Sequence, residues 1–154
     1  MALALYYHDV IYDPTRADNE QKSAEYAVDA LNTCLSLEQC QDLYALIIMT
    51  ANHQIDESID SVKYSSVKYS DAAYLLDMDL SILGAPWPTY EQYANAIRQE
   101  YAHISDIDYC DGRTAVLQRL LAHPKLYLTD YYYSQLETQA RDNINCELIS
   151  LAAL

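Results

Sequence analysis

The stretch SLEQCQDLYALIIM, residues 36–49, contains the pattern that decides the fold. Ser36 is followed three residues later by Gln39, and this spacing is typical of a capping box at the start of an α-helix. Apolar side chains then recur at helical spacing, at Cys40, Leu43, Ile47 and Ile48. Because residues three and four apart lie on the same side of a helix, these side chains form one apolar face. The stretch therefore predicts an amphipathic helix.

The same signs recur on both sides of this stretch. Asp18 and Gln21 have the capping-box spacing and open a helix that extends to Leu31. Residues 52–70, in which SVKYS occurs twice in tandem, are expected to form a long connection. Further helices are predicted around His8, at residues 71–83, 89–101 and 111–122, and from Thr129 onward. With only two glycines and four prolines in 154 residues, we expect one all-α domain, residues 1–154, of about seven helices.

The composition excludes several classes of function. Nine Lys and Arg residues against 23 Asp and Glu residues give a formal net charge of −14, so nucleic-acid phosphates and anionic lipid surfaces would repel the chain. Its apolar stretches are far shorter than the roughly 20 residues of a membrane span, and no basic segment precedes the apolar start. The four cysteines form no C-x-x-C pair, which suits a reducing compartment. We therefore expect a soluble, cytoplasmic protein that binds neither nucleic acid nor a membrane.

A doublet of His8 and Asp9 is the first candidate for chemistry. The helical neighbours of His8, three and four residues away on each side, are all apolar: Ala4, Leu5, Ile11 and Tyr12. Asp9 lies about 100° further round the same helix. At least one of the two side chains is therefore expected to point toward whatever this segment packs against.

Asp79 is the second candidate. Its helical neighbours are Leu75, Leu76, Ile82 and Leu83, which predicts that Asp79 lies on a buried face and needs a partner. Asp77 lies about 200° round the helix from Asp79, so Asp79 is the better candidate for a ligand. Together with His8 and Asp9 it would form a mixed imidazole and carboxylate set, which suits a divalent cation such as Mn, Fe, Mg, Ni or Zn. The alternative is a core His hydrogen-bonded to a core Asp without a metal.

Several stretches, in order along most of the chain, carry a resemblance to a known family. They are YYHDVIYDP at 6–14, DNE at 18–20, SAE at 23–25, LLDMDLSILGA at 75–85, IRQEY at 97–101, GR at 112–113 and PKLY at 124–127. The chain resembles the HD-superfamily metal-dependent phosphohydrolases, in particular a small bacterial group of predicted hydrolases. The resemblance implies an HD-domain-like helical bundle and a metal held by His8, Asp9 and Asp79. The family's first metal-ligating His lies on helices upstream of the doublet and has no counterpart here, so the chain is expected to be an N-terminally shortened member.

Other residues in these stretches are candidates for supporting roles. His53, where relatives tend to carry histidines, is expected to assist the metal or to protonate a leaving oxygen; alternatively it is an exposed residue stabilised by the helix dipole. Glu20 is a candidate for orienting a ligand or the attacking water, or else complements a helix N-terminus. Arg16, Lys22 and Arg98 are candidates for binding a phosphate, or else form surface ion pairs.

Two classes of function therefore remain open. The first is a metal-dependent phosphohydrolase that acts on a small phosphorylated molecule, with a nucleotide-like molecule as one candidate. The second is a degenerate, catalytically impaired HD-fold module that binds a partner. Because helices missing upstream would leave apolar side chains of residues 2–12 uncovered, a homo-oligomer is also expected, and in one variant a second subunit supplies the missing ligand.

Overall fold

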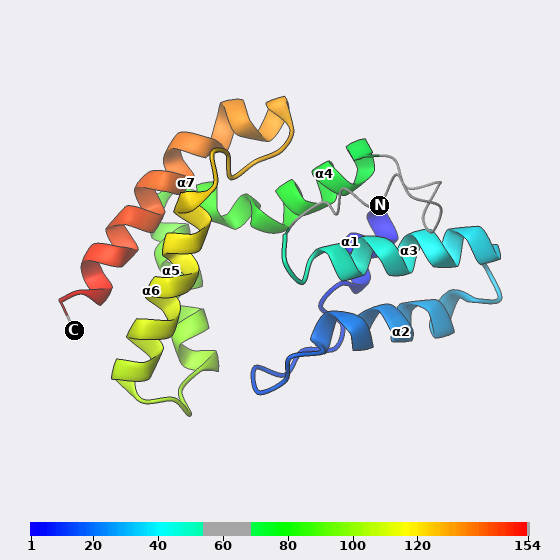
Figure 1. The fold of residues 1–154 in the computed structure, drawn as a ribbon, viewed down its shortest axis with the longest axis horizontal. Helices are drawn as coiled ribbons and strands as arrows, with labels where there is room; N and C mark the ends of the chain where they lie inside the picture. Colours follow the sequence, from blue (N-terminus) through cyan, green and yellow to red (C-terminus); the bar gives the residue numbers. More distant parts are fainter. Residues whose placement is uncertain (54–68, 154) are drawn as a thin grey trace. The chain divides into compact units, whose positions relative to one another are not determined.

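A computed structural model describes residues 1–53 and 69–153, and all regular secondary structure in these ranges is helical (Figure 1). Most of the tandem SVKYS segment, and of the connection predicted around it, lies outside the described residues. The described ranges contain seven α-helices: α1 (Ala2–Tyr7), α2 (Asn19–Leu31), α3 (Leu37–Met49), α4 (Tyr69–Asp79), α5 (Trp87–Glu100), α6 (Asp106–Ala122) and α7 (Asp130–Leu151). A 3₁₀ helix, η2 (Leu80–Gly84), follows α4 directly. The all-α prediction is confirmed, as is the expected number of helices.

Several helix boundaries differ from the expectation. The helix predicted around His8 ends at Tyr7, so Ile11 and Tyr12 are not helical neighbours of His8. The single helix predicted at 71–83 is divided, because the α-helix ends at Asp79 and the chain tightens into η2. The next helix begins at Trp87 instead of Thr89, with Pro88 in its first turn, where the missing N–H of a proline costs nothing. The helix predicted from Asp111 begins five residues earlier, since Ser105 caps it by accepting a hydrogen bond from the Asp108 N–H.

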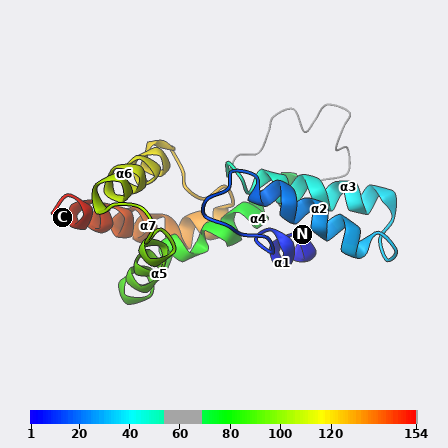
Figure 2. The ribbon, with the colours of Figure 1, turned by 90° about the horizontal axis from the view of Figure 1, so that it is seen from below.

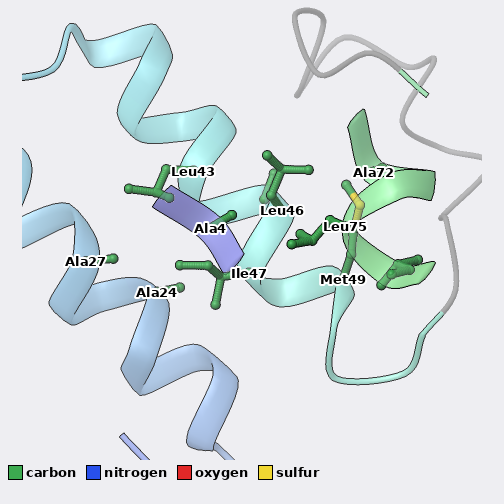
Figure 3. Close-up of a cluster of buried hydrophobic side chains, with 11 residues drawn as sticks. Ala4, Ala24, Ala27, Leu43, Leu46, Ile47, Met49, Ala72 and Leu75 are labelled. Atoms are coloured by element: carbon green, nitrogen blue, oxygen red, sulfur yellow. The ribbon is translucent and has the colours of Figure 1, made fainter. Parts of the chain in front are cut away.

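The chain divides into two compact units, each with its own core, and the first unit is Met1–Asp79. Within it, α2 and α3 lie side by side, as both views show (Figures 1 and 2), and α1 packs on α3. The small side chains of Ala24 and Ala27 are fully buried on α2 and allow the close approach. Figure 3 shows the core of this unit, which contains Ala4, Ala24, Ala27, Leu43, Leu46, Ile47, Met49, Ala72 and Leu75.

The second unit starts at Leu80 and is built by η2, α5, α6 and α7. Its core contains Leu83, Tyr90, Leu117, Leu126, Tyr127, Ala140 and Ile144. A buried carboxylate, Glu147 of α7, joins three helices, because it accepts hydrogen bonds from Arg113 of α6, at 2.7 and 3.1 Å, and from the hydroxyl of Tyr90 of α5. That residues 1–154 form one domain stays a prediction.

No helix within residues 1–53 and 69–153 has both the length and the apolar character needed to cross a membrane.

Candidate functional site

His8 directly follows α1, and both of its ring nitrogens are engaged. Nδ1 lies 2.8 Å from the carbonyl oxygen of Leu5, and because a carbonyl only accepts, Nδ1 carries a proton and donates. Nε2 lies 3.0 Å from Oδ1 of Asp79. The bond to Leu5 therefore orients the ring so that Nε2 faces the carboxylate, and the expectation that the doublet points into the unit holds for His8.

Asp79 is the last residue of α4, and its two oxygens accept hydrogen bonds from two different imidazoles. Oδ1 accepts from Nε2 of His8 at 3.0 Å, and Oδ2 accepts from Nε2 of His53 at 2.9 Å. Burial opposes ionisation of Asp79, but the hydrogen bonds from His53 and His8 outweigh it and hold its pKa well below the usual range. The hydrogen bond to Asp79 is also the main reason that the pKa of His8 is raised to about 9. The pair is therefore a carboxylate facing an imidazolium.

The expected difference in burial between Asp79 and Asp77 is reversed in the structure. Asp77 is completely buried, whereas the Asp79 side chain keeps 20% of its surface exposed. At about 100° per residue, Asp77 and the other buried residues of α4 cover roughly 200° of the helix, which is more than the single face that the pattern indicated. The buried residues of α4 are Ala72, Ala73, Leu75, Leu76 and Asp77.

His53 joins the site from a third segment, three residues beyond the C-cap of α3. Its φ of 52° lies in the left-handed region, and no other non-glycine residue in the described ranges has a positive φ. Such a conformation costs roughly 1–2 kcal/mol for a residue with a Cβ, so the surrounding contacts must hold it. The side chain is one-third exposed and reaches Asp79.

Asp9 and Glu20 lie beside this cluster. Oδ2 of Asp9 is 3.3 Å from Nε2 of His8, and 58% of the Asp9 side chain is exposed. Partial burial raises the pKa of Asp9, the nearby charge of His8 opposes this, and the carboxylates of Asp79 and Glu20 add to the increase. Glu20, in the first turn of α2, is thus close enough to act electrostatically on Asp9.

Two residues to which the sequence reasoning gave no role, Asn19 and Ser23, hold the loop that follows the doublet. The Asn19 side chain accepts from the N–H of Asp13 at 3.1 Å and donates to the Asp13 carbonyl at 2.9 Å. The Ser23 hydroxyl does the same for Ile11, at 3.1 Å in both directions. Both are buried on α2, inside the DNE and SAE stretches. A polar residue on the apolar face of a predicted helix was the signal that could have identified them.

The three cations predicted to bind phosphate have other partners. Arg16 donates to both oxygens of Asp18, at 2.8 and 2.7 Å, and Lys22 donates to Glu25 at 2.8 Å, all on the exposed surface of the first unit. Arg98 lies in the second unit and donates to Asp106 and to the carbonyl of Tyr101. Its guanidinium also lies 4.7 Å from the centre of the Tyr109 ring. The contacts of Arg16 and Lys22 are therefore those expected from the alternative, in which both residues form surface ion pairs.

The cluster combines imidazole and carboxylate groups, which are the donor types that bind transition metals in proteins. Within residues 1–53 and 69–153, no three His, Cys, Asp or Glu side chains are arranged to hold a metal ion. His8 and His53 are each hydrogen-bonded to Asp79. The N···O separations in the cluster, 2.9 to 3.3 Å, are those of hydrogen bonds and a close ion pair. Imidazole and carboxylate together suit Mn, Fe, Ni or Zn.

Comparisons of the chain with protein-family models, with curated proteins and with solved structures give no match.

Proposed function

We propose that this protein is a metal-dependent phosphohydrolase that acts on a small phosphate ester, with nucleotides as the first class to test. The observation that carries the proposal is the convergence of three separate segments, which contribute His8 with Asp9, His53, and Asp79, on one partly exposed cluster. A structural His–Asp pair would need one imidazole, whereas Asp79 binds two.

The residues that would hold the cation are His8, Asp9 and Asp79. A bound divalent cation would lower the pKa of a bound water molecule and would neutralise negative charge on the phosphoryl oxygens. If His8 loses its Nε2 proton when a cation binds, the carbonyl of Leu5 would keep the remaining proton on Nδ1, and the lone pair of Nε2 would face the site. The exposed oxygen atoms of Asp9 and the neighbouring Glu20 are placed to accept a proton from water that enters from solvent.

Arg16 and Lys22 would meet the charge of the phosphoryl group. Both are now paired with carboxylates at the surface. Exposed ion pairs are weak and salt-sensitive, so a phosphate dianion can compete for these cations. When substrate binds, Arg16 would release Asp18, or Lys22 would release Glu25, and the cation would pair with phosphate oxygens instead.

The test is metal content, by elemental mass spectrometry on protein purified without chelator, together with hydrolysis of p-nitrophenyl phosphate and a panel of nucleoside monophosphates. We expect about one transition metal per chain, and at least about 10²-fold less hydrolysis in Asp79→Asn. Asp29→Asn is the matched control, because it makes the same charge change at an exposed position of α2. Asp9→Ala, at an exposed side chain, removes a ligand with little effect on folding. Unchanged activity in Asp9→Ala would overturn the proposal.

A second function, an interaction module without catalysis, is favoured by the surface of α1. On α1, Tyr6 is 78% exposed and Leu3, one turn before it, is 41% exposed. Apolar side chains exposed together on a short helix favour association with another protein surface. Size-exclusion chromatography with light scattering tests this reading: a monomer at high concentration counts against self-association, and a dimer that Tyr6→Ser dissociates supports it.

A further inference from the structure

Three tyrosine rings form a continuous aromatic surface on the first unit. The ring centres of Tyr6 and Tyr7 on α1 are 5.1 Å apart in an edge-to-face arrangement, and the ring of Tyr7 lies 6.3 Å from that of Tyr26 on α2. Tyr26 is 50% exposed, so the apolar surface around Tyr6 extends from α1 onto α2. We call Leu3, Tyr6, Tyr7 and Tyr26 the tyrosine surface.

The packing of α2 explains why Tyr26 lies outside the core. Ala24 and Ala27 are fully buried and direct their side of the helix into the first unit. Tyr26 lies about 100° round the helix from Ala27 and about 200° from Ala24, and its ring therefore reaches solvent. Exposed tyrosines that touch one another offer a large, rigid and partly apolar contact area, which is typical of surfaces that bind another protein.

The part of the chain that carries this surface is strongly acidic. Residues 1–53 contain eight Asp and Glu residues but only two cations, Arg16 and Lys22. Both cations are already paired with carboxylates, since Arg16 contacts Asp18 and Lys22 contacts Glu25. The remaining carboxylates of this part of the chain therefore give it a negative potential.

Two exposed carboxylates lie close in sequence to the exposed rings. Asp29 is exposed and lies one turn after Tyr26, on the same side of α2. Asp9 follows Tyr6 by three residues, and 58% of its side chain is exposed. The tyrosine surface thus combines apolar rings with negative charge.

This combination selects among the possible occupants. A second copy of the chain would bring another formal charge of −14, and its repulsion opposes self-association. Lys and Arg side chains, in contrast, are attracted both by carboxylates and by the faces of exposed tyrosine rings. A helix with an apolar stripe bordered by Lys and Arg offers apolar contacts to the rings and cations to the carboxylates at the same time.

We propose that the tyrosine surface binds a Lys- and Arg-rich amphipathic helix of another protein. The proposal rests on the second function given above, the interaction module, and names the chemistry of its partner. Tyr6 packs among the apolar side chains of the bound helix, and Asp29 pairs with its cations. Hydrolysis plays no part in this binding.

The experiment measures binding of a fluorescein-labelled peptide by fluorescence anisotropy, with the full chain at about 150 mM salt. The peptide is about 18 residues long, or five helical turns, and consists of Leu and Lys with Leu at helical spacing. A second peptide has the same composition in an order that forms no apolar face. A third has Glu in place of Lys.

Two matched pairs of variants test the surface. Tyr6→Ser removes the most exposed ring, and its control is Tyr131→Ser, which removes a 57% exposed ring from the second unit. Asp29→Lys reverses a charge at the surface, and its control is Asp142→Lys, which makes the same change of net charge at an exposed position of α7. Thermal unfolding followed by circular dichroism establishes that each variant is folded.

We expect wild type to bind the amphipathic Leu and Lys peptide at least about tenfold more tightly than the rearranged peptide, and not to bind the Leu and Glu peptide. Tyr6→Ser and Asp29→Lys should each weaken binding at least about fivefold, and their two controls should bind like wild type.

Three results would overturn the proposal. Equal binding of the two Lys peptides, or equal affinity of Tyr6→Ser and Tyr131→Ser, would mean that net charge alone attracts the peptide. Equal binding of the Leu and Glu peptide would mean that cations play no part. A wild-type dimer that Tyr6→Ser dissociates would mean that a second copy occupies the surface, which supports an interaction module with a different partner. None of these results bears on the hydrolysis test with Asp9→Ala.

Discussion

At the scale of single residues, the contacts of His8 determine how the metal-free site responds to pH. Its pKa is raised from 6.5 to about 9, so its contribution to folding is fully present below about pH 6.5 and is lost as the pH rises through about 9. The pKa of Asp79 is shifted in the other direction, below its ordinary value of 3.8. Its contribution is therefore present above that pH and is lost in acid. The pair therefore stabilises the fold most between about pH 4 and about pH 6.5.

We predict that the protein, treated with chelator, loses on the order of 1–2 kcal/mol of unfolding free energy between about pH 6 and about pH 9.5. The reason is that the folded protein loses the proton of His8 as the pH rises through about 9, and with it the attraction between the imidazolium and the Asp79 carboxylate. Urea unfolding at the two pH values measures this loss. It should shrink in Asp79→Asn, whose neutral amide cannot attract the imidazolium, and persist in the exposed control Asp29→Asn. The same loss in wild type and Asp79→Asn would contradict the prediction.

The sequence pattern was sufficient to identify His8 and Asp79 but not the residues that hold them. Asp79 has apolar neighbours at helical spacing, which is a local signal, and for His8 only the preceding neighbours are helical because α1 ends at Tyr7. Asn19 and Ser23 act on the backbone of Asp13 and Ile11, and no local pattern specifies such a contact between segments. The buried Asp77 was missed for a related reason, because the burial of α4 over much of its circumference depends on tertiary packing.

At the scale of elements, the helices were predictable because caps and apolar periodicity are local, whereas some ends depend on neighbours. Gly84 illustrates the limit. Its place after an apolar run predicted a helix end, but the structure shows a close approach, in which a Cβ at Gly84 would lie 2.6 Å from Cβ of Leu136. Glycine is therefore required where η2 passes α7, and the absence of a side chain, more than backbone freedom, is what the position uses.

We predict that Gly84→Ala destabilises the second unit by about 1–3 kcal/mol, because the added methyl group overlaps a side chain on a packed helix. Gly112→Ala is the matched control. Gly112 lies inside α6, with no atom within 4 Å of an added Cβ, so alanine should stabilise by about 0.5–1 kcal/mol through its helix propensity. Thermal or urea unfolding followed by Trp87 fluorescence reports on this unit, since Trp87 is the single Trp of the chain and lies in α5. Equal stability of the two variants would argue against the close approach.

At the scale of the whole molecule, the formal charge of −14 affects every experiment with cations. Repulsion among 23 carboxylates destabilises the compact state, so any divalent ion stabilises the protein to some extent by screening. A specific site adds to this by mass action, because an ion that binds only the folded state stabilises it by about 2.7 kcal/mol at 100 times its dissociation constant. Screening depends on total charge, whereas binding depends on the cluster around Asp79.

One measurement can therefore separate charge screening from binding at the cluster around Asp79. We predict that micromolar Mn²⁺ or Co²⁺ raises the melting temperature of wild type and of Asp29→Asn at constant ionic strength, and that the rise is absent in Asp79→Asn. The two variants carry the same net charge, so screening affects them equally and only the site distinguishes them. Chelator should return wild type to the melting temperature of the metal-free protein. If all three proteins shift together, the ions act through the general charge of the molecule, and the His8, His53 and Asp79 cluster is a hydrogen-bonded structural element without a metal.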